Sequence, residues 1–341
     1  MRWRGWANGL VAATLLLATG ASAQDEAGFQ SFLQSIRGRA LSEGVRADTF
    51  DSVASSLTFN PRVVELDRQQ PEASPNAPIP NFAPYKAQHV DAARISRGRA
   101  VYQRERPRLE RIERETGVPE SIMVAIWGHE TNYGAYTGNF DLPRSLASLA
   151  YEGRRRQLFT DEFIATLRMI DRGVPRDRLK GSWAGAFGYP QFLPSVYLRL
   201  ARDGDGDGRA DIWSNPADTL ASIANYFVNA GWRAGQPWGL AVTVPADFNR
   251  ADMKNRTLSP RCPRVHDRHS RWRTIAEWRR MGIMPQDKPW PADDVLATLI
   301  EPDGAGRTAY LLTVNYRVIL DYNCSNFYAL SVGLLADEVA R

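Results

Sequence analysis

The chain has 341 residues, of which 43% are hydrophobic and 24% are charged, and its formal net charge is +5. A chain of this length can bury a substantial core, and we expect two or three lobes of an ordinary globular protein. The mild basic excess suits an anionic polymer, but acidic residues interleave the arginines between Arg94 and Arg114, which favours a solvated helical face over a nucleic-acid surface.

Residues 1–23 are predicted to be a signal peptide. Arg2 and Arg4 precede an apolar run from Leu10 to Ala18, and Ala21-Ser22-Ala23 is typical of a cleavage site. The apolar run is too short for a permanent membrane anchor, and no cysteine follows the cleavage site to carry an acyl chain. We therefore expect an exported, soluble protein that is cleaved near Ala23 and makes no contact with nucleic acid.

Residues 24–84 are predicted to be an N-terminal helical segment followed by a proline-rich strap. Apolar residues from Phe29 to Ile36 recur at helical spacing, and a second short helix is expected over Ala47–Leu57. Five prolines lie between Pro71 and Pro84, so this stretch is expected to be extended.

Residues 85–237 are predicted to form a helical lobe. A long helical pattern runs from Tyr85 to Thr116, with an expected break at Pro107. A helix that begins near Pro119 and carries Glu130 follows, and further helices are expected over Asp161–Met169 and Pro216–Ala230.

Residues 238–320 are predicted to form a small mixed α/β lobe inserted in this helical protein. A helical pattern over Thr274–Met281 lies among β-rich runs, which are Leu240–Val244, Leu296–Ile300, Ala309–Val314 and Tyr316–Leu320. Residues 321–341 return to helical spacing and should pack back onto the helical lobe. The predicted fold class is therefore mainly α (α+β).

Glu130 is the first candidate for chemistry. It lies three and four residues after Trp127 and Ile126, so it shares their apolar helix face. A carboxyl group walled by Trp and Ile loses hydration, which raises its pKa toward the range useful for an acid at neutral pH. The alternative is a structural glutamate paired with an arginine. His129-Glu130 begins like a zinc-protease motif, but Tyr133 stands where the second histidine ligand must be.

Two further segments contain candidate substrate-binding residues. Residues 181–195 are rich in glycine and alanine, and their Ser182 and Gln191 could bind a carboxyl or acetamide group, or the small residues could simply serve helix packing. Tyr322-Asn323, followed by Tyr328, could stack on and read a sugar, or form a turn.

Residues 203–214 read D-G-D-G-D-G-R-A-D-I-W-S and resemble a calcium loop. The expected ligands are Asp203, Asp205, Asp207, the Arg209 carbonyl and Asp211, although Ser214 replaces the usual last glutamate. The loop could equally be an Asp-Gly turn that binds no ion. The two cysteines, Cys262 and Cys324, are expected to pair in a disulfide, because an exported chain meets an oxidising compartment.

These segments together resemble the B-type lytic murein transglycosylases of bacterial cell walls, over the chain from about Tyr85 to its C-terminus. The motifs that carry the resemblance are G-V-P-E…G-H-E-T-N-Y-G, the block of residues 181–195, the D-G-D-G-D-G loop and the terminal Y-N pair. The resemblance implies a lysozyme-like helical catalytic lobe beside a small β-containing lobe, a periplasmic location, peptidoglycan strands as the substrate and cell-wall machinery proteins as possible partners.

The resemblance also implies residue roles. Glu130 matches the family's single catalytic acid/base, and Ser182 matches the serine that orients it. Implied substrate contacts are Gln191, Tyr322, Asn323, Tyr328, Arg154, Arg155, Tyr133 and, as a looser match, Tyr85. No cofactor is implied for catalysis, and a structural calcium is possible.

The implied reaction cleaves the MurNAc-β-1,4-GlcNAc bond without water and forms 1,6-anhydroMurNAc, with Glu130 acting first as acid and then as base. Two alternatives are a muramidase that admits water and a non-catalytic peptidoglycan-binding protein.

Overall fold

The structure is a computed structural model that describes residues 11–70, 80–256, 259 and 261–341, with the backbone alone for residues 11–24. Its chain divides into two compact units, each built from two stretches of sequence. The first unit contains residues 1–73 and 137–199, and the second contains residues 74–136 and 200–341. The predicted helical lobe of residues 85–237 is therefore shared between the two units, because contacts rather than sequence order define them.

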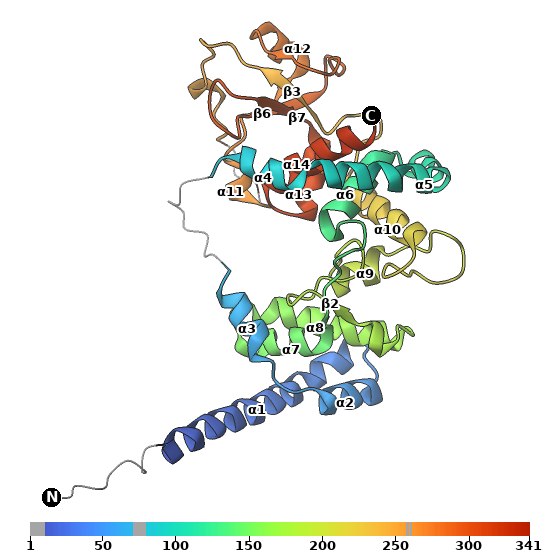
Figure 1. Ribbon diagram of the computed structural model, residues 1–341, viewed down its shortest axis with the longest axis vertical. Coiled ribbons are helices and arrows are strands. Elements are labelled where there is room, and N and C mark those ends of the chain that lie inside the picture. Colours follow the sequence, from blue (N-terminus) through green and yellow to red (C-terminus); the bar gives the residue numbers. More distant parts are fainter. Residues whose placement is uncertain (1–10, 71–79, 257–258, 260) are drawn as a thin grey trace, which may run out of the picture. The chain divides into compact units, whose positions relative to one another are not determined.

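The first unit is helical. Its elements (Figure 1) are α1 (Val11–Ser42), α2 (Ala47–Ser56), α3 (Pro61–Arg68), α7 (Leu142–Glu152), α8 (Arg156–Asp171), α9 (Pro194–Leu200) and a two-stranded antiparallel pair, β1 (Phe140–Asp141) with β2 (Lys180–Gly181). Side-chain caps begin two of these helices: Asn60 accepts from the Arg62 amide before α3, and Asp141 accepts from the Arg144 amide before α7.

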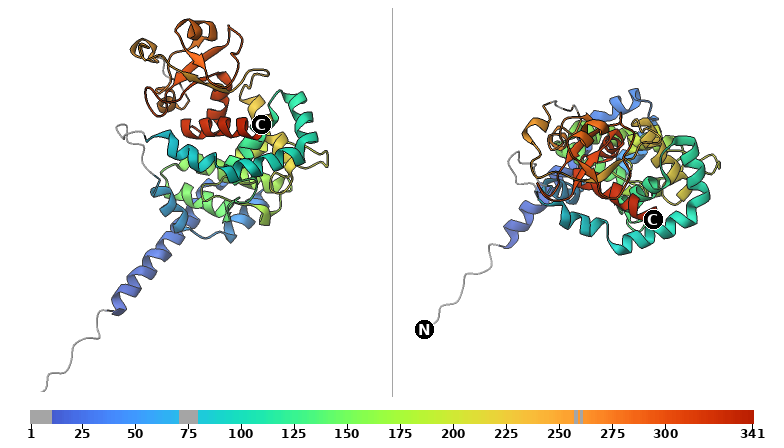
Figure 2. Two further views of the ribbon diagram at one scale, coloured as in Figure 1. Left: turned by 45° about the horizontal axis from the view of Figure 1, so that its top comes forward. Right: turned by 90° about the horizontal axis from the view of Figure 1, so that it is seen from above.

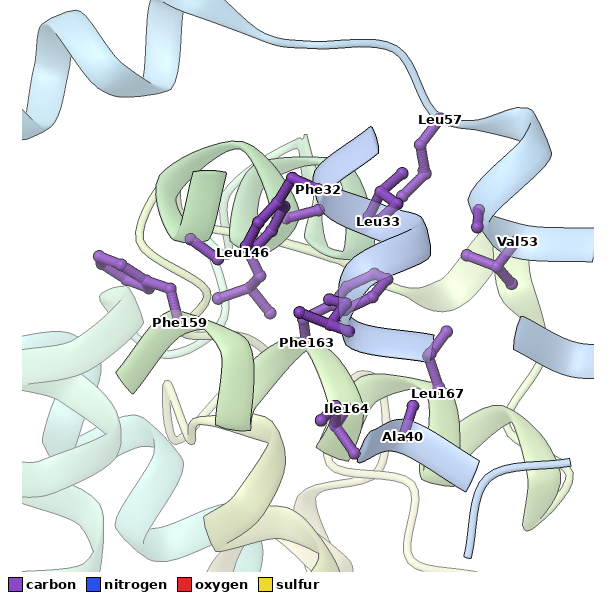
Figure 3. Packing of buried hydrophobic residues seen from close by; sticks show 14 of the residues in the cluster. Phe32, Leu33, Ala40, Val53, Leu57, Leu146, Phe159, Phe163, Ile164 and Leu167 are labelled. Atoms are coloured by element: carbon purple, nitrogen blue, oxygen red, sulfur yellow. The ribbon is translucent and has the colours of Figure 1, made fainter. Parts of the chain in front are cut away.

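A single apolar core holds the first unit together. Figure 3 shows Phe32 and Leu33 of α1, Val53 of α2, and Phe163 and Leu167 of α8 turned toward one another. All five are buried, and α7 closes the cluster from the side. The helical spacing predicted around Phe29 and over Ala47–Leu57 is confirmed by α1 and α2.

Helix α6 (Glu120–Thr131) lies among the longer helices of the second unit and packs on three of them, α5, α10 and α14. These longer helices are α4 (Phe82–His89), α5 (Ala92–Thr116), α10 (Pro216–Asn229), α13 (Val314–Tyr322) and α14 (Asn326–Val339). The α14 helix packs on α4, α5, α6 and α13, and α10 packs on α5 and α6. Every residue from Ile122 to Gly128 is buried, so α6 is the central helix of this unit.

A small antiparallel sheet completes the second unit (Figure 2). Its strand order is β4-β6-β7-β3-β5, from β3 (Gly239–Thr243), β4 (Arg273–Thr274), β5 (Met284–Pro285), β6 (Leu296–Ile300) and β7 (Ala309–Leu312). Leu311 pairs with both Leu240 and Leu299. Two short helices accompany the sheet, α11 (Pro263–His266) and α12 (Ile275–Arg280), and Trp278 of α12 is buried against it.

The structure corrects three predicted elements. Tyr316–Leu320 is not a strand but part of α13, because its β-branched residues pack in a helix that Thr313 caps. The pattern from Tyr85 to Thr116 breaks at Asp91, whose side chain caps α5, while Pro107 stays inside α5 on an exposed face. Pro84 is not extended but lies in the first turn of α4, where a helix does not need the missing amide.

Other predictions fall on the chain's less described parts. Residues 1–10 of the predicted signal peptide and residues 71–79 of the predicted strap lie outside the described residues. The predicted cleavage site at Ala23 lies within α1, and no described helix combines the length and apolar character needed to cross a membrane.

The predicted disulfide between Cys262 and Cys324 is confirmed, with Cα atoms 5.5 Å apart.

Candidate active site

Glu130 lies in the last turn of α6, where the helix stops abruptly. Asn132 and Tyr133 both adopt left-handed backbone conformations, with φ of 52° and 61°, and the amide of Asn132 bonds back to the carbonyl of Gly128. This cap ends α6 one residue after Glu130. The apolar residues of α6 therefore bury the helix, while its end places one carboxyl group at the edge of that core.

The surroundings of Glu130 favour its protonated form. Burial raises the pKa of its carboxyl from 4.5 to about 7, and a hydrogen bond from Tyr328 holds that pKa below the value burial alone would give. The Tyr328 hydroxyl donates to Oε1 over 2.5 Å. A carboxyl group with a pKa near neutrality can both give and take a proton at physiological pH.

Two more tyrosines of the second unit lie near this carboxyl. Burial, reinforced by the negative charge of Glu130, raises the pKa of Tyr85 and of Tyr322 above 10. Tyr322 ends α13 and packs on Tyr226 at a centroid distance of 4.6 Å, and the next residue, Asn323, is exposed. The second unit thus brings together Glu130, Tyr328, Tyr322 and Tyr85. Asn323 follows Tyr322 in the chain, and its contact with substrate stays a prediction.

Tyr133 has a packing position. A Cβ atom added at Gly128 or Gly98 would lie 2.5 Å or 2.4 Å from Tyr133 side-chain atoms, so both glycines make room for this tyrosine. Its hydroxyl donates to the carbonyl of Arg94. Tyr133 therefore joins the end of α6 to α5, and its contact with substrate stays a prediction.

Ser182 and Gln191 belong to the first unit, in the loops between β2 and α9. The Ser182 hydroxyl oxygen accepts from the amide of Ala186, which leaves its own proton able to donate. The Gln191 side-chain nitrogen donates to the carbonyls of Gly188 and Thr137. Both side chains are half-buried and held by local backbone. A Cβ atom at Gly181 would lie 2.3 Å from the Ala186 carbonyl oxygen, so close packing is also a reason for the small residues here.

Arg154 and Arg155 are joined to a buried aspartate of the same unit. Arg154 Nε bonds to Asp67 Oδ2 over 2.8 Å, and Arg155 bonds to Asp67 Oδ1. Asp67 is only 1% exposed, so the two guanidinium groups neutralise a carboxylate that would otherwise be costly to bury. The pair ties α3 to the start of α8, and its predicted contact with peptidoglycan stays a prediction.

Two predicted ligands in the acidic loop of residues 203–214 lie close to a third carboxylate from outside the loop. One oxygen each of Asp203, Asp205 and Asp218 lies within 4.8 Å of the others. Asp218 is fully buried in the first turn of α10, and burial and then the negative charges of the two loop aspartates raise its pKa. Oxygen donors are what calcium prefers, and a cation would offset this repulsion, so the three residues fit a calcium site.

The other predicted ligands stay predictions. The carboxylate of Asp207 accepts from the Arg209 amide, and that of Asp211 accepts from the amides of Trp213 and Ser214. Asp203 and Asp205 accept from backbone amides in the same way. Asp218 was missed because it lies four residues beyond the twelve-residue loop pattern. Its only local signal is an acid in the first turn of a helix that follows Asn215-Pro216.

Known proteins resemble this chain over most of its length. A family model described as transglycosylase SLT domain matches residues 28–337. Membrane-bound lytic murein transglycosylase B of Escherichia coli is 30% identical over 281 residues, which cover 81% of this chain and 73% of the relative.

Two solved structures illustrate the structural likeness. SltB3 from Pseudomonas aeruginosa in complex with NAG-anhNAM-pentapeptide is 38% identical with a TM-score of 0.81, covering 92% of this chain and 79% of that one. The lytic transglycosylase Slt35 from Escherichia coli in complex with calcium is 27% identical with a TM-score of 0.72, covering 92% of this chain and 93% of that one.

Replacing Tyr328 by Phe tests the electrostatics of the site. Loss of a hydrogen bond to a carboxylate, about 1.5–3 kcal/mol, should raise the pKa of Glu130 by about one pH unit or more. The measurement is an NMR titration of selectively labelled glutamate carboxyl carbons. Tyr136→Phe, an exposed tyrosine of the same unit, should leave the titration unchanged. An unchanged Glu130 pKa in Tyr328→Phe would contradict the described bond.

Proposed function

Because the chain belongs to the transglycosylase SLT domain family, we propose that it cleaves the MurNAc-β-1,4-GlcNAc bond of peptidoglycan without water, with Glu130 as acid and then base. Family membership and the likeness to lytic murein transglycosylases make the protein a lytic transglycosylase, a lyase that acts on peptidoglycan. The observation that supports the finer proposal is the position of Glu130 at the end of the buried helix α6, with the Tyr328 hydroxyl on its carboxyl group. Burial there raises the pKa of Glu130 to about 7.

A single carboxyl group suits this reaction. Most glycosidases use two carboxyl groups, one as acid and the other as base or nucleophile. Among the described residues, burial and the Tyr328 hydroxyl are the causes of the Glu130 pKa shift, and no second carboxylate contributes to it. The 2-acetamido group of the substrate can stabilise the positive charge that develops at C1, so a second side chain is not required.

The proposed steps balance without water. Protonated Glu130 donates its proton to the glycosidic oxygen as the bond from C1 to that oxygen breaks, which releases GlcNAc with a free 4-hydroxyl. Ionised Glu130 then takes the proton of the MurNAc 6-hydroxyl, whose oxygen bonds to C1 and closes 1,6-anhydroMurNAc. Glu130 ends protonated, ready for the next cycle. A pKa near 7 keeps both protonation states accessible during these steps.

The candidate site residues are proposed to serve these steps. Tyr328 orients the carboxyl through its hydrogen bond. The orienting role that the family resemblance implies for Ser182 remains a proposal, and its hydroxyl proton is able to donate. Tyr322, Asn323 and Gln191 are proposed sugar contacts, since aromatic faces and amides suit sugar rings and acetamido groups. More distant parts of the peptidoglycan strand are proposed to contact Tyr85, Tyr133, Arg154 and Arg155.

The proposed location is the periplasm, after cleavage of a signal peptide near Ala23. The substrate lies in that compartment, and peptidoglycan strands are the proposed binding partner. Proteins of the cell-wall machinery are proposed as further partners, and nucleic acid is not.

Asp203, Asp205 and Asp218 are proposed to hold a structural calcium ion, with Asp207, the Arg209 carbonyl and Asp211 as further proposed ligands. Slt35 was solved in complex with calcium, which supports the proposal. The ion would neutralise acids at the start of α10 and so stabilise the loop, and no catalytic step depends on it.

Digestion of purified peptidoglycan with the wild-type protein and a Glu130→Gln variant tests the reaction. The wild type should release muropeptides with anhydro ends, lighter by one water than the hydrolysis products. Loss of the acid should reduce release by about 10²–10⁴-fold, while the fold persists. Glu110→Gln, at a half-buried position on α5, is the control and should keep full activity.

Mass spectrometry of the products separates the alternatives. Reducing-end MurNAc from the wild type would indicate a hydrolytic muramidase, and absence of release would indicate a binding protein. Full activity of Glu130→Gln would remove Glu130 from the mechanism.

Thermal unfolding with and without calcium tests the loop. Calcium should raise the midpoint of the wild type and EDTA should reverse the rise. Asp218→Asn removes one of three carboxylates and should weaken calcium binding by roughly tenfold or more, with most of the rise lost. Asp247→Asn, an exposed aspartate of the same unit, should behave as the wild type. If the unfolding midpoint of the wild type does not change when calcium is added, the proposed calcium site is contradicted.

A further inference from the structure

Tyr328, the partner of Glu130, lies at one end of a row of packed rings. Tyr85 stacks on His89 with ring centroids 3.8 Å apart and an interplanar angle of 12°. His89 is parallel to His129 at 5.4 Å, and His129 meets Tyr328 edge-on at 5.1 Å. The row therefore runs from α4 through the end of α6 to α14 and stops at the Tyr328 ring, whose hydroxyl bonds to Glu130.

The α4 end of this row is anchored at several points. The amides of Phe82 and Ala83, at the start of α4, both donate to Asp303 Oδ1. His89 Nδ1 lies 2.9 Å from the Tyr85 carbonyl, and the His89 carbonyl accepts from Arg94 at the same distance. The backbone that carries Tyr85 and His89 is thus held in place. Their rings can therefore restrain the His129 ring and, through it, the Tyr328 ring.

His129 contributes a ring and not a charge. Burial, together with its neighbours Arg94 and His89, lowers its pKa to about 3, so the imidazole is neutral at physiological pH. Its Nε2 is buried and has no hydrogen-bond partner among the described residues. A buried nitrogen without a partner costs free energy, and the proposed reaction gives His129 no part in proton transfer. The ring contacts it does make are with His89 and Tyr328.

We propose that His129 and His89 are positioning residues of the reaction, which hold the Tyr328 ring so that its hydroxyl stays on the Glu130 carboxyl. A phenol can swing about its Cα–Cβ bond unless neighbours block it, and a packed row of flat rings blocks it at little entropic cost. The functional part of this inference rests on the proposed role of Glu130 as the acid, whereas the effect on the Tyr328 bond does not.

Titratable and charged groups near Glu130 and the row of rings influence the pKa that a titration of Glu130 measures. Tyr328, Tyr322 and Tyr85 face the carboxyl, and burial raises the pKa of each phenol above its usual value. Arg94 and His89 face His129. Because the Tyr328 bond lowers the pKa of Glu130, a weaker bond must raise that pKa. The first step needs protonated Glu130, so the alkaline limb of the pH profile should then move to higher pH.

A double-mutant cycle tests whether His129 acts through Tyr328. The variants are His129→Ala, Tyr328→Phe and the double variant, measured by the pH profile of kcat/KM and by NMR titration of Glu130. His129→Ala should lower kcat about tenfold with little change in KM and should move the alkaline limb to higher pH, by less than Tyr328→Phe does. The double variant should show the shift of Tyr328→Phe alone, because His129 has no bond left to support.

Conservative replacement separates ring packing from other roles. His129→Phe keeps a flat ring and should restore most of the activity and the wild-type alkaline limb. Ile275→Ala is the control for lost stability, since this buried residue belongs to the core of the sheet. It should lower the melting temperature without moving the pH profile. If His129→Ala does not fold, His89→Ala, at a half-buried position on α4, should give a smaller shift in the same direction.

Three results would overturn the inference. They are additive shifts in the double variant, a His129→Phe variant that resembles His129→Ala, and folded alanine variants at positions 129 and 89 with the wild-type pH profile. These outcomes are distinct from failure of the proposed function. If Glu130→Gln stays active, the role of the acid is wrong, but the NMR titration still reports whether the rings hold Tyr328.

Discussion

The desolvation of one carboxyl group is the constraint on which the second unit depends. Helix α6 is buried along its whole apolar length, and its left-handed cap stops it one residue after Glu130. A charged carboxylate in this place is unfavourable, which raises its pKa to about 7. The same burial that makes the helix a core element therefore raises the pKa of Glu130 toward neutrality, as the proposed single acid requires.

Helix α14 brings the other half of the site to Glu130. Its first turn carries Tyr328, and the turn before it carries Asn323 and the disulfide-bonded Cys324. The helix itself packs on α4, α5 and α6, so its position is set by the core of the unit. The row of rings through His129 adds a second support to Tyr328 from the side of α4. The hydrogen bond from Tyr328 to Glu130 thus depends on packing contacts from several elements, which suits a site that needs a fixed geometry.

Much of this could be predicted from sequence, where the signal was local. The spacing of apolar residues predicted α1, α2, α10 and α14, and the position of Glu130 after Trp127 predicted a desolvated acid. The strand predicted over Tyr316–Leu320 was wrong. A short run of buried β-branched residues in a helix has the same sequence pattern as a strand. Asp218 and the row of rings depend on residues distant in sequence, and no local pattern reports which of them meet. The division into two units also could not be foreseen, since each unit joins two separate stretches.

The dependence of stability on pH, compared between the wild type and Glu130→Gln, tests the desolvation of Glu130 most directly. The folded state holds the proton up to about pH 7, whereas the unfolded chain loses it near pH 4.5. The wild type should therefore lose stability relative to the glutamine variant as pH rises between these values, by about 3 kcal/mol in all, with no further change at higher pH. Urea unfolding across this range measures the difference. Parallel stability curves would show that the Glu130 carboxyl titrates as it does in water and would contradict the account.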